Sequence, residues 1–471
     1  MGDYQLHDEY DLIVLGLGPG GEAVASKLAQ AGRRVLGVDA RLVGGECPYY
    51  GCIPSKMIVR AAHTLAESRR VGQLAGTASD RPDFSRVAER IRDEAADDWD
   101  DQVAVDRLEG FGAHFLRGAA RFAGRTAAGL PVVEVGDRRF VARDGVVVAT
   151  GASPTLPPIP GLRQLAGDKL SPDGPVWTNR EVLQIKQAPR SLIVIGGGPI
   201  GTELVQAFNR FGVRVTQLEA AEQILSAEEA AAAEVVADVL RREGVDLRVG
   251  VKITDISSGE DGVVVELEGG ERIEAERLLV AAGRRTNLSE LALGSVGLDP
   301  DSAHLYVDEH MRAGEKIFAV GDVTGVAPFT HVATWQARVL IEHLLARPES
   351  FGGYHGLAWC TFTDPEVGHV GITERQARER GIDVTTGRAE IADDSRGWIH
   401  GPGNDGFVKL VVDRSAGVLV GATVVAPSGG EILGLLSLAV HAKVPVATLA
   451  TMHYVFPTLH RTVLEAVQAI G

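Results

Sequence analysis

The feature that most constrains this chain is one pattern that occurs twice: an apolar stretch, a glycine-rich turn, a helical stretch and a second apolar stretch that ends in an acid. The first copy has these parts at residues 12–15, 16–21, 22–32 and 35–38, followed by Asp39. The second copy has them at residues 191–195, 196–201, 202–211 and 213–218, followed by Glu219. Each copy predicts a strand–helix–strand unit of a parallel sheet, so we expect an α/β fold.

The parts of this pattern suit a dinucleotide. Glycines let the backbone approach a pyrophosphate, the start of the helix supplies amides and a positive dipole, and the acid accepts hydrogen bonds from ribose hydroxyls. One such turn would fit an ordinary dehydrogenase, whereas two turns predict two dinucleotides. The sequence therefore indicates a flavin and a nicotinamide cofactor.

The acid of the second copy indicates which nicotinamide is used. Glu219 would repel a 2′-phosphate, and the residues that follow, 220–222, contain no arginine that would bind one. Arg214 lies in the expected strand and is not placed to reach the pocket. We expect NADH to be preferred over NADPH.

The most specific segment is residues 44–56, which contains Cys47 and Cys52. Pro54 suits the first turn of a helix that starts near Cys52, and a thiol at a helix start has a lowered pKa. A close cysteine pair of this kind predicts a redox relay. A metal site is not expected, because no second cysteine or histidine cluster stands at ligand spacing. Cys360 is expected to be an ordinary buried residue.

Composition excludes several classes of function. A formal net charge of −16 argues against nucleic acid and against an anionic membrane surface as partners. No apolar run is long enough to span a bilayer, and the acidic first twelve residues do not resemble a signal peptide. We expect a cytoplasmic protein, in which three cysteines among 471 residues are not structural disulfides.

The remaining segments suggest how the chain is organised. Four prolines in residues 154–160 indicate a linker. Residues 83–109 read as helical, and their acidic cluster is interpreted as a solvated face. Beyond Phe351 the pattern changes to alternating strands at 406–426 and then helices, which predicts a third domain.

With these residues, the chain resembles the class I pyridine nucleotide-disulfide oxidoreductase family, which includes dihydrolipoamide dehydrogenase, glutathione reductase and mercuric reductase. The resemblance covers essentially the whole chain and includes four further elements: Ala149-Thr150-Gly151-Ala152, Ala282-Gly283-Arg284, Val320-Gly321-Asp322 and Phe362-Thr363-Asp364-Pro365-Glu366. It implies two Rossmann-like domains and an α+β dimerisation domain. The implied boundaries are 1–155 and 285–350 for FAD, 156–284 for NAD and 351–471 for the interface.

The resemblance also implies roles for individual residues. The residues implied to hold FAD are Gly16, Gly18, Gly21, Asp39, Gly151, Asp322 and Thr330, with Lys56 at the flavin's reactive edge, and those implied to line the NADH site are Gly198, Glu219 and Gly283. Cys52 would contact the flavin, Cys47 would attack the substrate, and Lys56 would pair with Glu203. The implied assembly is a homodimer in which the partner chain completes each active site.

One motif departs from the family. Most members that reduce disulfides carry His-Pro-Thr-x-x-Glu near the C-terminus, and that histidine protonates the departing thiolate of the partner's site. Here the matching positions hold Phe456 and Arg461. A phenyl ring exchanges no proton, so ordinary lipoamide or glutathione chemistry is expected to be slow. His453 and His460 are the nearby alternatives.

Two functions stay open. The first is an NADH-dependent reductase that acts through Cys47 and Cys52 on a disulfide or a thiol-reactive substrate. The second is a flavin-centred reductase of quinones, metal ions or another acceptor, with the cysteines as an accessory store. Because it lacks this histidine, the chain resembles mercuric reductase, although the C-terminal cysteine pair of that enzyme type is absent from the sequence. Because it has a proline after Cys47, it also resembles 2-ketopropyl-coenzyme M oxidoreductase/carboxylase. A non-enzymatic binding protein is disfavoured, because the Lys56–Glu203 pair would then serve no purpose.

Overall fold

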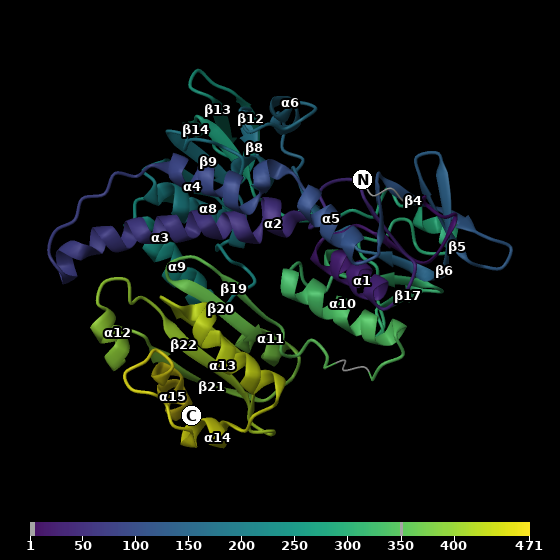
Figure 1. Ribbon diagram of the computed structural model, residues 1–471. Coiled ribbons are helices and arrows are strands. Elements are labelled where there is room, and N and C mark those ends of the chain that lie inside the picture. Colours follow the sequence, from purple (N-terminus) through teal and green to yellow (C-terminus); the bar gives the residue numbers. More distant parts are fainter. Residues whose placement is uncertain (1–4, 349–351) are drawn as a thin grey trace. The chain divides into compact units, whose positions relative to one another are not determined.

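The computed structural model describes residues 5–348 and 352–471 of the chain (Figure 1). The chain forms two compact units, each made of three segments. Unit 1 comprises Met1–Pro54, Glu89–Thr155 and Arg284–Phe351, and unit 2 comprises Ser55–Ala88, Leu156–Gly283 and Gly352–Gly471. Residues 55–88 thus group with unit 2, whereas the sequence places them with the first FAD segment. The assignment of the segments to FAD- and NAD-binding domains stays a prediction.

Unit 1 is built on an eight-stranded sheet. Its strands are β1 Glu9–Leu15, β2 Val35–Asp39, β3 His114–Arg117, β4 Ala120–Arg125, β5 Pro131–Val135, β6 Arg138–Val148, β17 Arg312–Gly314 and β18 Ile317–Ala319. They follow the order β17-β18-β6-β1-β2-β3, and β5 and β4 extend from β6. The pairs β18–β6, β6–β1, β1–β2 and β2–β3 are parallel. A short ladder joins β7 Ala152–Pro154 to β16 Arg284–Thr286.

Alternate residues in the second half of β1 face two cores, which is why residues 12–15 are apolar throughout. Leu12 and Val14 pack with helices on one face, and Ile13 and Leu15 pack on the other. The helical segments of unit 1 include α1 Pro19–Gln30, α2 Glu46–Tyr50, α5 Gln102–Gly110, η3 Leu293–Val296, η4 Asp322–Thr324 and α10 Thr330–Leu344. Helices α1 and α10 lie side by side on this sheet (Figure 1).

Unit 2 contains a parallel sheet and two antiparallel sheets. The parallel sheet has the order β11-β10-β9-β15-β8: Asp246–Arg248, Arg214–Leu218, Ser191–Ile195, Arg277–Val280 and Val176–Trp177. A small sheet follows as β12 Ile253–Ser258, β13 Val263–Leu267 and β14 Arg272–Ala275. The C-terminal sheet has the order β19-β20-β23-β22-β21: Ala358–Thr361, Glu366–Gly371, Val418–Ala426, Phe407–Asp413 and Val384–Glu390.

The helices of unit 2 cover these sheets. They are α6 Leu162–Ala166, α7 Asn179–Val182, α8 Pro199–Arg210, α9 Ala230–Arg242, α11 Glu374–Glu379, α12 Ser395–His400, α13 Gly429–His441, α14 Val446–Thr451 and α15 Arg461–Gln468. Helix α3, Cys52–Leu74, begins at the end of a unit 1 segment and lies mostly in unit 2. No helix among the described residues combines the length and apolar character that a membrane crossing requires.

Residues 83–109 are helical over most of their length, as expected, but they do not form one continuous helix. Helix α4, Phe84–Arg90, passes into a π-helical turn at Ile91–Ala95 and a 3₁₀ turn at Asp97–Trp99 before α5 begins. Three consecutive residues, Asp97, Asp98 and Trp99, have φ of 47°, 51° and 58°. Left-handed backbone ends a right-handed helix, and a sequence without glycine there gave no sign of it.

Candidate active site

The first glycine turn is held by the acid that follows it. The Asp39 carboxylate accepts hydrogen bonds from the amides of Leu17, at 2.7 Å, and Arg41, at 2.7 Å. Burial raises the pKa of Asp39, and these amides oppose that shift. Gly16 has a φ of +91°, and a Cβ there would come within 2.4 Å of the Ala149 carbonyl oxygen. The turn therefore requires glycine at 16 and a carboxylate at 39.

The second turn repeats the arrangement. Glu219 accepts hydrogen bonds from the amide of Gly197, at 2.5 Å, and from that of Ala221, at 2.7 Å. A Cβ on Gly201 would come within 2.4 Å of the Gly196 carbonyl oxygen. Both acids thus hold the amide that follows the first glycine of the turn. This brace is not visible in the sequence, from which we expected only a ribose contact.

Both turns fit a dinucleotide. Helices α1 and α8 begin after Gly18 and Gly198, and neither first turn has a side-chain cap. A Cβ on Gly198 would meet no described atom within 4 Å, and one on Gly18 would meet only the Gly45 Cα, at 3.9 Å. Space that a side chain would fill is thus left beside uncapped amides, which is what a pyrophosphate needs. Gly283 is equally open, with a φ of +110°.

Further candidate FAD residues lie in unit 1. Asp322 begins η4; burial raises the pKa of its carboxyl, and Arg284 opposes that shift. Gly151, with a φ of +64°, follows Thr150, whose hydroxyl donates to the Asn287 carbonyl oxygen at 2.9 Å. These contacts fix the two loops at the carboxyl ends of the parallel strands, where ligands of such sheets bind.

The cysteine pair stands at the junction of two helices. Cys47 lies in α2, and α3 begins at Cys52, as the proline at 54 predicts. Hydrogen bonding with Cys52, together with burial, raises the pKa of the Cys47 thiol. The Cys52 sulfur lies 3.4 Å from the hydroxyl of Thr330, the first residue of α10. The structure thus brings both cysteines together and sets Thr330, which we assigned to FAD, against them.

Side chains that we did not predict hold the cysteine segment. Trp99 donates from its indole nitrogen to the Tyr49 carbonyl oxygen at 3.3 Å, and Asp101 accepts from the Val43 amide at 2.6 Å. Arg284 forms an ion pair of 3.3 Å with Glu46. Asp101 is buried, whereas the rest of the acidic cluster around it is exposed. The prediction that this acidic cluster is a solvated helix face is therefore wrong for Asp101.

The Lys56 ammonium lies 2.5 Å from the Glu203 carboxylate. The other Glu203 oxygen accepts from the Phe362 amide at 2.9 Å, and the ammonium also lies 4.8 Å from the centre of the Phe362 ring. Glu203 is buried and Lys56 is partly exposed. The motif at residues 362–366 directly follows β19, which lies at the edge of the C-terminal sheet.

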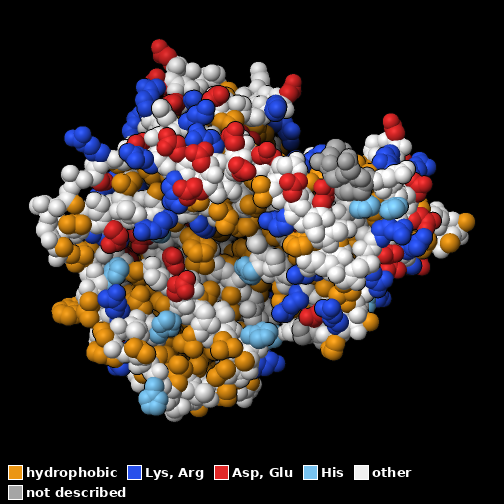
Figure 2. Space-filling view, in the orientation of Figure 1, with side chains coloured by type: hydrophobic (Ala, Val, Ile, Leu, Met, Phe, Trp, Pro, Cys, Tyr) orange, Lys and Arg blue, Asp and Glu red, His pale blue; other side chains and the backbone are white. Residues whose placement is uncertain are grey.

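The structure also describes the C-terminal segment that departs from the family's His-Pro-Thr-x-x-Glu motif. Phe456 is 63% exposed, and the Arg461 guanidinium lies over its ring. His453 and His460 are exposed. Around this segment, unit 2 carries apolar surface (Figure 2). The exposed large apolar residues of the C-terminal segment are Trp398, Ile399, Leu438, Met452, Val455 and Phe456.

Comparison with known sequences assigns the chain to a family. The pattern of the pyridine nucleotide-disulphide oxidoreductases matches residues 10–337, and that of the family's dimerisation domain matches residues 357–467. The chain belongs to the pyridine nucleotide-disulphide oxidoreductase family. It is therefore a flavin-dependent oxidoreductase that uses FAD and a pyridine nucleotide, and its dimerisation domain supports a homodimer.

Individual relatives cover almost the whole chain. The dihydrolipoyl dehydrogenase of Halobacterium salinarum is 33% identical, over 98% of this chain and 96% of its own length. The mercuric reductase of Shigella flexneri is also 33% identical, over 95% of this chain and 78% of its own length. The crystal structure of LpdA from Mycobacterium tuberculosis matches with a TM-score of 0.85 and 27% identity, over 97% of this chain and 98% of that one. The predicted α/β fold with its α+β dimerisation domain is confirmed.

Proposed function

We propose that this oxidoreductase transfers electrons from NADH through FAD to the Cys47–Cys52 pair, and from there to a disulfide or another thiol-reactive substrate. The observation that carries the proposal is the placement of the two cysteines: Cys47 lies in α2, Cys52 begins α3, and the Thr330 hydroxyl lies beside the Cys52 sulfur. Bound FAD supplies two-electron chemistry between the nicotinamide and the cysteines. A cytoplasmic location belongs to the same proposal, because the pair must alternate between disulfide and dithiol.

The cysteines divide the work in the substrate step. The Cys47 thiol gives up its proton and its sulfur attacks one sulfur of the substrate disulfide, which forms a mixed disulfide; the departing sulfur takes up that proton and leaves as the first thiol. The Cys52 thiolate then attacks the Cys47 sulfur, which restores the Cys47–Cys52 disulfide and releases the second thiol. Each cycle consumes one NADH and one proton, and yields NAD⁺ and two thiols.

Other residues of the chain serve the nicotinamide. We infer that Lys56 and Glu203 act in the NADH-dependent step, and that the buried carboxylate holds the ammonium in place. Gly198 and Gly283 would leave the backbone open to the cofactor, and Glu219 would favour the ribose diol of NADH over the phosphate of NADPH. The FAD contacts belong to Gly16, Gly18, Gly21, Asp39, Gly151 and Asp322. In the homodimer, the partner's copy of the segment around position 456 would complete the substrate site.

The test compares Cys47→Ser with Cys360→Ser, the same substitution outside the pair. Anaerobic NADH should expose two additional titratable thiols per chain in the parent and in Cys360→Ser, and none in Cys47→Ser. Disulfide-dependent NADH oxidation should disappear only in Cys47→Ser. Full disulfide turnover by Cys47→Ser would refute the cysteine route.

A second candidate function is flavin-centred reduction of quinones or metal ions. It is favoured by the absence of an acid at Phe456 and by the similarity to a protein named mercuric reductase. Under this alternative, Cys47→Ser keeps NADH oxidation with a quinone at the parent rate. If the quinone-dependent rate falls together with the disulfide-dependent rate, the flavin-centred route is excluded.

A further inference from the structure

Helices α3 and α8 each present three polar side chains on one face, at spacings that align side chains along a helix. On α3 these are Lys56, His63 and Arg70, and on α8 they are Glu203, Gln206 and Arg210. All three on α8 are buried. Both faces contact residues 362–364, the segment that follows β19.

The α8 face holds this segment by its backbone. Glu203 accepts from the Phe362 amide at 2.9 Å. Gln206 accepts from the Asp364 amide at 2.8 Å and donates to the Asp364 carbonyl oxygen at 2.8 Å. Glu203 and Gln206 of α8 thus bind the backbone of Phe362 and Asp364, which are two residues apart. The position of Asp364 therefore determines where the Phe362 amide meets Glu203.

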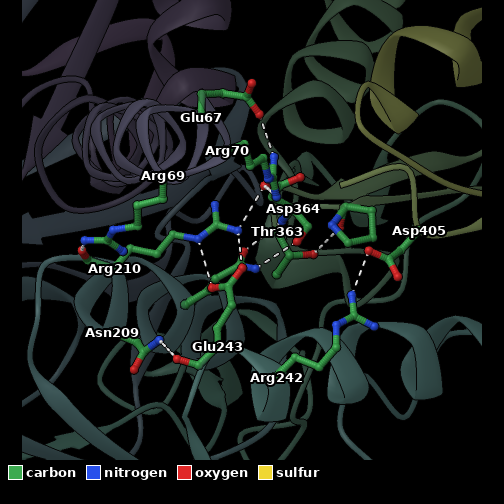
Figure 3. Close-up of polar contacts among 12 residues, drawn as sticks. Glu67, Arg69, Arg70, Asn209, Arg210, Arg242, Glu243, Thr363, Asp364 and Asp405 are labelled. Atoms are coloured by element: carbon green, nitrogen blue, oxygen red, sulfur yellow. Dashed lines mark hydrogen bonds and ion pairs between the residues drawn. The ribbon is translucent and has the colours of Figure 1, made fainter. Parts of the chain in front are cut away.

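Asp364 in turn joins the two helices (Figure 3). One of its carboxylate oxygens lies 2.8 Å from Arg70 on α3 and 2.9 Å from Arg210 on α8. Arg210 also pairs with Glu243 at 2.5 Å, and Arg70 with Glu67 at 2.5 Å. Burial alone would raise the pKa of Asp364, but the two guanidinium groups hold it below its ordinary value. The junction is therefore a charged carboxylate between two cations.

The space around Glu203 between these layers is closely filled. Glu203, His63, Gln206, Arg210 and Phe362, among others, leave no room there for a water molecule. The His63 Nε2 and Arg210 Nη1 atoms have no hydrogen-bond partner among the described residues. Burial lowers the pKa of His63 to about 4, so the imidazole is neutral at pH 7 and does not repel the guanidinium groups of Arg70 and Arg210. Close packing, the hydrogen bond from the Phe362 amide and the ion pair with Lys56 together hold the Glu203 carboxylate.

We propose that Gln206, Asp364 and Arg70 are positioning residues: they set the place of the Phe362 amide and of Glu203, and through Glu203 they set the place of Lys56. The inference rests on the proposed role of Lys56 and Glu203 in the NADH-dependent step. It adds three residues outside that pair, to none of which the sequence analysis gave a role.

The experiment uses Arg70→Met, Arg70→Lys and Gln206→Met in the FAD-loaded dimer. The limiting rate of reduction by NADH, followed by flavin absorbance, should fall roughly tenfold in Arg70→Met and Gln206→Met, because small misplacements of a reacting group are costly. The dissociation constant of NADH should stay within about twofold. Arg70→Lys keeps a cation beside Asp364 and should recover most of the rate.

A second readout does not depend on turnover. Without NADH, an amine-reactive reagent should acylate Lys56 several times faster in Arg70→Met than in the parent, with the peptide quantified by mass spectrometry. The matched control is Glu67→Gln, which removes the exposed partner of Arg70 and should change neither measurement. If Arg70→Met does not fold with FAD, Gln206→Met tests the same coupling without removing a charge.

A double-mutant cycle decides whether Arg70 acts through Glu203. In a Glu203→Gln background, Arg70→Met should slow reduction by NADH by a further factor of less than two, because the Glu203–Lys56 interaction that Arg70 positions is already lost. Fully additive effects would overturn the proposal and leave Arg70 a general stabilising residue. If Glu203→Gln itself leaves reduction unchanged, the proposed function of the Lys56–Glu203 pair fails. If it slows reduction while Arg70→Met and Gln206→Met do not, only the positioning inference fails.

Discussion

The guanidinium carbon of Arg461 lies 5.4 Å from the centre of the Phe456 ring. The guanidinium also faces the carboxylates of Asp394, at 4.0 Å, and Glu465, at 3.9 Å. A cation over an exposed ring contributes about 0.5–1 kcal/mol, enough to bias the orientation of Phe456. The positions where disulfide-reducing relatives carry a histidine–glutamate acid pair thus hold an aromatic–cation pair, which transfers no proton.

Restoring the acid pair should accelerate disulfide reduction. We expect Phe456→His together with Arg461→Glu to raise the rate of reoxidation by lipoamide or glutathione disulfide about tenfold or more, since general acid catalysis contributes roughly 10²–10⁴-fold. The measurement is reoxidation of the NADH-reduced enzyme in stopped flow. Phe456→His alone, with Arg461 left beside the new imidazole, is the control and should gain less. A parent enzyme already as fast as a lipoamide dehydrogenase would contradict the prediction, and His460 and His453 would then be the next residues to replace.

Glu219→Gln should narrow the preference for NADH. Loss of the negative charge removes the repulsion of a 2′-phosphate, and we expect the ratio of kcat/KM for NADH to that for NADPH to fall about tenfold, which corresponds to about 1.4 kcal/mol. The amide keeps one oxygen for Gly197 but none for Ala221, so NADH itself should also bind more weakly. Steady-state kinetics with both cofactors provide the test. A parent enzyme that prefers NADPH would show that the role of Glu219 has been misassigned.

Asp39→Ala should lower the FAD content of the purified protein. The substitution leaves the Leu17 and Arg41 amides without their carboxylate acceptor, so the glycine turn loses its brace. We expect about one FAD per chain in the parent and a clearly lower flavin-to-protein absorbance ratio in the variant. The exposed Asp137→Ala in the same unit is the control. Equal flavin content in both variants would contradict the role of Asp39.

Glu228 should make stability depend on pH. Its side chain is buried and accepts from the Trp359 indole at 2.5 Å, and its other oxygen lies 4.0 Å from the His369 imidazole. Burial raises the pKa of Glu228 from 4.5 to about 7. Between these values the folded state binds more protons than the unfolded state. The contribution of Glu228 to the free energy of unfolding is therefore fully present below pH 4.5. It falls by about 3 kcal/mol as the pH rises through 7.

Glu228→Gln isolates this contribution because an amide does not titrate. Burial lowers the pKa of His369 to about 4, and that histidine contributes in the opposite direction, but it is present in both proteins and cancels in the difference. We expect the urea midpoint of the variant, relative to the parent, to rise steadily from pH 5 to pH 8. The exposed Glu234→Gln on α9 should show no such trend. A difference that does not change with pH would mean that Glu228 is ionised throughout.

The sequence predicted those parts of the site that local chemistry determines. The helix start at Cys52 follows from the proline two residues later, and the two turns follow from glycines that only a close backbone approach requires. Contacts between distant segments were not predictable: nothing near Gln206 in the sequence indicates that it binds the backbone of Asp364. The left-handed residues at 97–99 were missed for a related reason, because tertiary contacts such as that of Trp99 with Tyr49 hold a conformation that the local sequence does not favour.

The brace formed by Glu219 limits how the cofactor preference of this protein can be redesigned. The carboxylate that would select against a 2′-phosphate also holds the amides of Gly197 and Ala221. A single replacement therefore alters charge and loop shape together, and a gain in NADPH use would be offset by a looser turn. A successful exchange needs two changes, one that supplies a cation for the phosphate and one that gives the two amides a new acceptor. The same coupling is expected to limit natural drift at this position, because loss of the carboxylate alone would loosen the turn for either cofactor.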